Sequence, residues 1–72
     1  MPPSKDMTML KVNSKALLLA MAEQELEPKE LAAKAGVAPQ VVYVARRGCY
    51  IKPKYLGKLA KALEVQTTDL VE

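Results

Sequence analysis

Apolar residues recur at the spacing of amphipathic helices along most of the chain, and prolines and glycines separate the helical stretches. The first stretch follows Asn13 and Ser14, and either of them can cap a helix N-terminus because its side-chain oxygen accepts a hydrogen bond from a free backbone N–H. The periodicity predicts that this helix runs to about Gln24. Its inward-facing positions are Leu17, Ala20 and Met21.

Two further helices are each opened by a proline and closed by a glycine. Pro28 suits a first helical position because its missing N–H needs no partner there, and Glu27 before it favours the positive end of the helix. Gly36 closes this helix and can take a positive φ without a Cβ clash, so the chain can turn sharply into a third helix at about Pro39 to Arg47. Gly48 then ends the third helix.

The remaining apolar positions predict a fourth helix and a short final turn. A loop from Cys49 to Lys52 leads to the fourth helix, Pro53 to about Leu63, where leucines and alanines repeat at helical spacing. Thr67 can cap the last short turn, and Leu10 to Val12 is a brief apolar stretch before the first helix. The predicted fold class is therefore all-α, with about five helices.

The length of the chain fits a single domain. Seventy-two residues bury only about 60% of the surface of the unfolded chain, which leaves little room for an enclosed catalytic cavity. We expect residues 10–72 to form the domain and residues 1–9, with two prolines and a serine, to form a disordered tail. The tail would be a cloning remnant or an upstream start, since Met7 and Met9 offer alternative starts.

Three consecutive leucines, Leu17 to Leu19, span about 200° of a helix surface and cannot all face one core. Leu17 is the inward residue of the three. Either Leu18 or Leu19 should therefore meet Leu10 and Val12, or a second subunit.

Positive charge is concentrated in one part of the chain. No carboxylate occurs from Leu31 to Leu63, so the net charge of +3 understates the asymmetry. A basic field over two helices and the turn between them indicates a polyanion or an acidic partner, of which nucleic acid is the commonest. The rival interpretation is a merely solvated surface. The seven positive residues of this run are Lys34, Arg46, Arg47, Lys52, Lys54, Lys58 and Lys61.

Composition argues against several other classes of protein. The chain has no histidine and one cysteine, Cys49, so it lacks the usual base near neutral pH and cannot complete a zinc set or an internal disulfide. We therefore expect no catalytic residue, no metal, no cofactor and no small-molecule ligand, and an enzyme is disfavoured. A lone thiol and the lack of an 18-residue apolar run favour a cytoplasmic location without membrane contact.

The string "LEPKELAAKAGVAPQVVYVARRG", followed by "KPKYLGKLAKALEVQTTDLV", resembles the helix-turn-helix domains of the lambda Cro and cI-repressor type, which occur in phage and mobile-element regulators. The likeness covers about residues 13–71, with the helix-turn-helix at about residues 27–48. It implies a compact five-helix, lambda-repressor-like domain that places its third helix in the major groove of double-stranded DNA. It also implies a function in transcription regulation.

The resemblance also suggests which residues contact DNA. Positions that match Pro39, Gln40, Val41 and Val44 approach base edges in such proteins, and we expect Tyr43 to face the groove with them. Those that match Arg47, Lys52 and Lys54 lie beside phosphates, and Arg46 would join this phosphate-binding set.

The chain departs from the family pattern at three places. Pro39, Val41 and Val44 stand where family members often have Gln, Ser, Arg or Asn, which leaves Gln40 as the only amide at the front of the third helix that could hold adenine. Pro28 replaces a glutamine that helps to clamp a phosphate in many relatives. Met21 and Arg46 stand where relatives often have an internal Arg–Glu ion pair, so Arg46 should seek solvent, phosphate or a carboxylate of a partner.

Two functions remain open. The first is a DNA-binding transcriptional regulator, a repressor of Cro/cI type that can form a homodimer on DNA because two-fold sites lengthen the readout. The second is an antirepressor, an interaction module whose apolar front on the third helix (Val41, Val44 and Tyr43) occupies the DNA-binding domain of a partner repressor.

Overall fold

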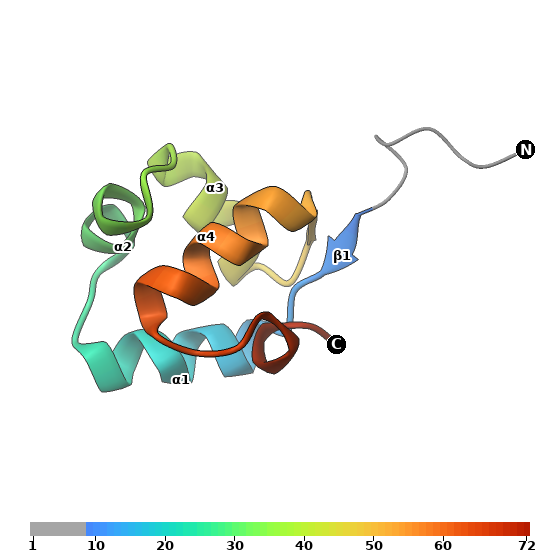
Figure 1. Ribbon diagram of the computed structural model, residues 1–72, viewed down its shortest axis with the longest axis horizontal. Coiled ribbons are helices and arrows are strands. Elements are labelled where there is room, and N and C mark those ends of the chain that lie inside the picture. Colours follow the sequence, from blue (N-terminus) through green and yellow to red (C-terminus); the bar gives the residue numbers. More distant parts are fainter. Residues whose placement is uncertain (1–8) are drawn as a thin grey trace, which may run out of the picture.

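Four α-helices make up most of the part of the chain that the computed structural model describes, residues 9–72 (Figure 1). The disordered tail predicted for residues 1–9 falls almost entirely outside this range. Two short strands and a 3₁₀ helix complete the secondary structure. In chain order the elements are β1 (Leu10–Lys11), α1 (Ser14–Gln24), α2 (Pro28–Ala35), α3 (Pro39–Arg46), β2 (Tyr50–Ile51), α4 (Pro53–Leu63) and η2 (Thr67–Leu70).

The helix starts agree with the prediction from sequence. The Asn13 side chain accepts a hydrogen bond from the backbone N–H of Ala16 at 3.1 Å, which caps α1. Pro28, Pro39 and Pro53 are the first residues of α2, α3 and α4. Each proline therefore occupies the position where a missing N–H costs nothing.

The helix ends also agree with the prediction, since α1 ends at Gln24 and α4 at Leu63, and α3 ends at Arg46, one residue before the predicted end. Gly36 follows α2 with φ 74° and Gly48 follows α3 with φ 78°, so both glycines take the left-handed conformation that the sequence predicts. The ends of α1 and α4 have no such glycine. Glu25 (φ 54°) and Glu64 (φ 60°) are left-handed there although they carry a Cβ.

A small antiparallel ribbon, missed by the sequence analysis, joins the two ends of the described chain to its middle. Leu10 pairs with Ile51 and Lys11 with Tyr50. On the other side of β1, Val12 bridges to Val71. The fold is mostly helical, which is consistent with the predicted all-α class. The two strands have two residues each and come from the brief apolar stretch before α1 and from the loop predicted before α4.

The fifth predicted helix is a four-residue 3₁₀ helix, η2. Its N-cap is Gln66 and not Thr67, and the Asp69 carboxylate accepts the Gln66 backbone N–H at 3.1 Å. The N-cap of η2 therefore lies one residue earlier than predicted.

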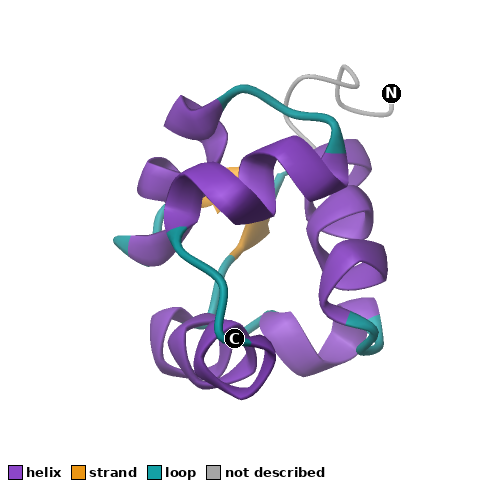
Figure 2. Ribbon diagram, turned by 90° about the vertical axis from the view of Figure 1, so that its left-hand side faces the viewer, coloured by secondary structure: helices purple, strands orange, loops and turns teal. Residues whose placement is uncertain are grey.

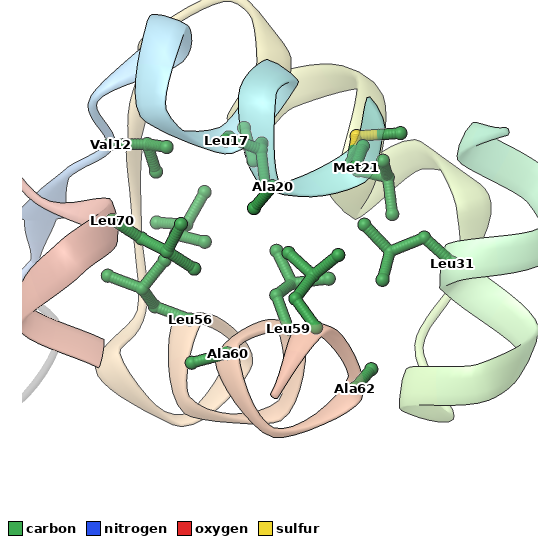
Figure 3. Close-up of a cluster of buried hydrophobic side chains, with 14 of the residues drawn as sticks. Val12, Leu17, Ala20, Met21, Leu31, Leu56, Leu59, Ala60, Ala62 and Leu70 are labelled. Atoms are coloured by element: carbon green, nitrogen blue, oxygen red, sulfur yellow. The ribbon is translucent and has the colours of Figure 1, made fainter. Parts of the chain in front are cut away.

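Apolar side chains from every helix meet in one core, part of which is drawn in Figure 3. Leu17 of α1, Leu31 of α2 and Leu59 of α4 have no exposed surface, and Leu70 of η2 closes the cluster. In this core α2 packs against both α3 and α4, while α1 contacts α3 and η2. Figure 2 shows that the helices surround the two short strands. All buried side chains within residues 9–72 are apolar, so the core is held by hydrophobic burial alone.

The two leucines that follow Leu17 remain at the surface. Leu18 keeps 42% and Leu19 56% of its surface exposed. Leu10 and Val12 therefore bury neither leucine, and the other contact expected from the sequence, with a second subunit, stays a prediction. Across residues 9–72, no helix has the length and apolar character that crossing a membrane requires.

The left-handed Gly36 leads to a prediction about stability. Gly36→Ala should lower the free energy of unfolding by about 1 kcal/mol, and Gly36→Val should lower it further because a β-branched side chain crowds the turn. A Cβ at Gly36 would have no heavy atom within 4 Å, so the loss comes from the backbone conformation and not from a clash.

Gly57 offers a matched control. It lies inside α4, and a Cβ there would also meet nothing within 4 Å. Gly57→Ala should therefore stabilise the protein by roughly 0.5–1 kcal/mol through helix propensity. Urea melts followed by circular dichroism measure all three variants, and equal stabilities of Gly36→Ala and the parent protein would contradict the explanation.

Candidate nucleic-acid interface

Helix α2 is packed into the core, whereas α3 leaves one of its faces exposed to solvent. Leu31 and Ala32 of α2 are buried, and Ala32 is small enough for α3 to cross closely. After the left-handed Gly36, the N–H groups of Gly36 and Val37 both donate to the Ala32 carbonyl, at 2.9 and 3.0 Å. These bonds satisfy the end of α2 and fix the direction in which α3 leaves.

The predicted base-reading residues differ in how far they reach solvent. Pro39, Gln40 and Tyr43 are exposed, whereas Val41 is half-buried. Val44 is also half-buried and packs against the core. Less of its side chain is therefore free to contact a partner than the predicted exposed apolar front of α3 requires. The opposite face of α3 is buried as predicted, because Val42 and Ala45 have no exposed surface.

A hollow of about 340 Å³, which we call the α3–β2 hollow, lies beside the front of α3. It brings Gln40, Val41 and Val44 together with Lys52, and no carboxylate lines it. Its lining is mostly apolar, with two tyrosines. The full lining is Met9, Ala38, Gln40, Val41, Val44, Tyr50, Ile51, Lys52 and Tyr55.

A second hollow, the Arg46 hollow, lies where α3 meets α1. Its volume is about 410 Å³ and its lining residues are Leu18, Tyr43, Arg46 and Arg47. The structure thus divides the predicted site residues between two hollows. Pro39 and Lys54 line neither of them.

Arg46 is held by its backbone while part of its side chain lacks a partner. The Ser14 hydroxyl donates to the Arg46 carbonyl at 2.6 Å. The Arg46 Nε is buried and has no hydrogen-bond partner among the described residues. A buried donor without a partner is costly, and an incoming acceptor could satisfy this Nε only after the Arg46 side chain had moved.

The other predicted phosphate-binding residues surround the corner after α3. Arg47 is the exposed C-cap residue of α3, and Lys52 is the exposed N-cap residue of α4. Lys54 is exposed in the first turn of α4. Among residues 9–72, the ion pair of the basic run lies at the ends of α2 and α4, where Lys34 Nζ is 3.9 Å from Glu64 Oε2.

Two residues at this corner were not among the predicted contacts. Lys11 of β1 pairs across the ribbon with Tyr50, and its Nζ donates to the Gly48 carbonyl at 2.8 Å. Tyr50 is 58% exposed. The only signal in the sequence was the apolar–polar alternation of Leu10 to Val12, which is too short to indicate a strand.

Residues that could ligate a metal are scattered. Among residues 9–72, no three histidine, cysteine or acidic side chains gather closely enough to hold a metal ion. Cys49 is free and exposed.

The exposed cations of this corner can attract anions, and the α3–β2 hollow beside them presents an apolar and aromatic surface. Comparison of the chain with models of protein families, with curated proteins and with solved structures found no match.

Proposed function

We propose that the protein is a sequence-specific, DNA-binding transcriptional regulator of the Cro/cI type, in a phage or mobile-element switch. In this proposal α2 and α3 form a helix-turn-helix, and α3 lies in the major groove. A DNA target goes with a cytoplasmic location and with no catalytic activity.

The observation that carries the proposal is the position of the basic residues relative to α3. Arg47 is the C-cap residue of this helix, Lys52 is the N-cap residue of α4 just after β2, and Lys54 lies in the first turn of α4. All three are exposed, and no carboxylate occurs anywhere from Leu31 to Leu63. Cations beside a groove-reading helix neutralise phosphates and release counterions, so this placement favours duplex DNA.

The proposed contacts to bases rest on fewer residues. Gln40 is exposed in the first turn of α3 and can donate to and accept from adenine. Pro39 and Val41 beside it offer apolar contacts to thymine methyl groups, and Tyr43 and Val44 lie one turn further along. A homodimer would double this short readout.

The test is the salt dependence of binding to duplex DNA. Affinity should fall steeply with salt, and Lys52→Ala or Lys54→Ala should each weaken all sequences alike while reducing the slope of log K against log salt by about one unit. Fluorescence anisotropy with a labelled duplex measures both effects.

Lys61→Ala provides the control. This exposed lysine lies in the last turn of α4, far along the helix from Lys52 and Lys54. Lys61→Ala should change the net charge by the same amount as Lys52→Ala or Lys54→Ala but leave the slope of log K against log salt unaltered. A parent protein whose affinity did not depend on salt would rule out the DNA-binding proposal.

The α3–β2 hollow favours a second candidate, an antirepressor that blocks a partner repressor. Apolar side chains and two tyrosines line this hollow along the same face of α3 that would read bases. Aromatic residues are enriched in protein interfaces, and Lys52 in the lining suits a partner that presents an acidic side chain. The DNA-binding function requires Gln40 to contact a base, whereas the antirepressor function does not.

A further inference from the structure

One exposed ridge of α1 is unexplained by either candidate function. Leu19 is the more exposed of its two surface leucines, at 56%. Lys15 and Glu23 stand four residues before and four residues after Leu19 and are also exposed. Because residues four apart share a helix face, the three side chains form a single row.

The charges along this row are arranged symmetrically about Leu19. Lys15 lies about 6 Å along the helix axis on one side of Leu19, and Glu23 lies about 6 Å on the other side. Neither residue has an ion-pair partner within residues 9–72. The row is therefore basic at one end, apolar in the middle and acidic at the other end.

We propose that this row is a dimer interface that binds α1 of a second copy of the chain in antiparallel orientation. A two-fold axis beside Leu19 would place each Leu19 against its counterpart and each Lys15 against Glu23 of the second copy. A parallel arrangement would bring like charges together. The charges of the row therefore favour an identical row as the partner and favour its antiparallel orientation.

The surroundings of the row leave room for α1 of a second copy. Leu18 flanks the row and also lines the Arg46 hollow, where two guanidinium groups face no carboxylate. Ala22, on the same exposed face, is small enough for two helices to approach closely. A ridge next to a recess is the shape that helix–helix packing requires.

The proposal needs no DNA and goes beyond the proposed function. The area is small, so we expect a weak dimer with a dissociation constant of roughly 10 μM to 1 mM. Sedimentation equilibrium of the chain alone, at concentrations up to about 1 mM, measures this constant.

Charge reversal provides the decisive comparison. Lys15→Glu and Glu23→Lys should each raise the dissociation constant by about tenfold or more, since each places two like-charge pairs across the interface. The double variant should return it to within about threefold of the parent value. Lys61→Glu, which changes the net charge as Lys15→Glu does, should leave the dissociation constant unchanged.

Leu19→Glu tests the apolar centre of the row and should abolish the dimer. Because Leu19 is exposed, circular dichroism should show an intact fold; if that variant unfolded, the charge reversals would still decide. A parent protein that stayed monomeric at about 1 mM, or reversals that failed to restore one another, would overturn the proposal.

Discussion

Gln40→Ala should reduce affinity for the preferred operator by about 5-fold to 150-fold while leaving affinity for random DNA unchanged. This corresponds to the roughly 1–3 kcal/mol that one good bidentate contact to a base contributes. Gln40 is the amide that the first turn of α3 presents to solvent, and no other amide on this helix could replace it. Fluorescence anisotropy with the operator and a scrambled duplex gives both constants.

Gln24→Ala is the matched control, since Gln24 is an exposed amide at the end of α1. The complementary variant is Val41→Asp. Val41 is half-buried beside the α3–β2 hollow, and an acidic residue in the first turn of a helix is well tolerated. This variant should fold and should damage either complex, whereas Val44→Asp would also disturb the core.

The pair of variants separates the two functions. If Gln40→Ala changed nothing while Val41→Asp abolished binding to a repressor protein, the antirepressor would be correct and the DNA-reading function of α3 would be wrong. An operator-specific loss in Gln40→Ala would give the opposite answer.

Leu59→Ala should lower the free energy of unfolding by about 2–5 kcal/mol. Leu59 is fully buried in α4, where it meets side chains from α1 and α2 (Figure 3). A domain of this size has only about 5 kcal/mol or little more to lose, so the variant should be partly unfolded near body temperature.

Leu19→Ala is the control for Leu59→Ala, because the same atoms are removed from a side chain that is 56% exposed. Its effect should stay within about 0.5 kcal/mol. Thermal and urea melts of the two variants give the comparison, and similar losses would contradict the assignment of the core.

Helix starts could be predicted from the sequence because proline carries its own conformational restriction. Pro28, Pro39 and Pro53 fix φ near the helical value and lack a donor, whatever surrounds them. Glu25 and Glu64 have no comparable local signal. Their left-handed conformations are imposed by how the chain must leave α1 and α4, which only the packed structure decides.

The ribbon could not be predicted for a related reason. Leu10 and Ile51 are far apart in the sequence, and strands of two residues are too short to show a period. They form because the core places the segments side by side. Lys11 therefore reaches the corner after α3 through tertiary structure alone.

The candidate site was only partly accessible from sequence. The run of positive charge is linear and could be read directly, as could the buried positions Val42 and Ala45 on α3. The division of the site between two hollows depends on α1 and β2, which are remote in sequence. The half-burial of Val44 follows from its packing against the core and has no separate sequence signal.

The connection between the two ends of the domain has a consequence for its cooperativity. The Asn13 N–H donates to Leu70, and the Glu72 N–H donates to Lys11, so the segments before α1 and after α4 share their hydrogen bonds. Neither segment can fray without exposing the backbone groups of the other. Residues of β1 also pair with β2, so local opening at either end of the domain disturbs the corner that follows α3. We therefore expect the two terminal segments and this corner to unfold together as one cooperative unit.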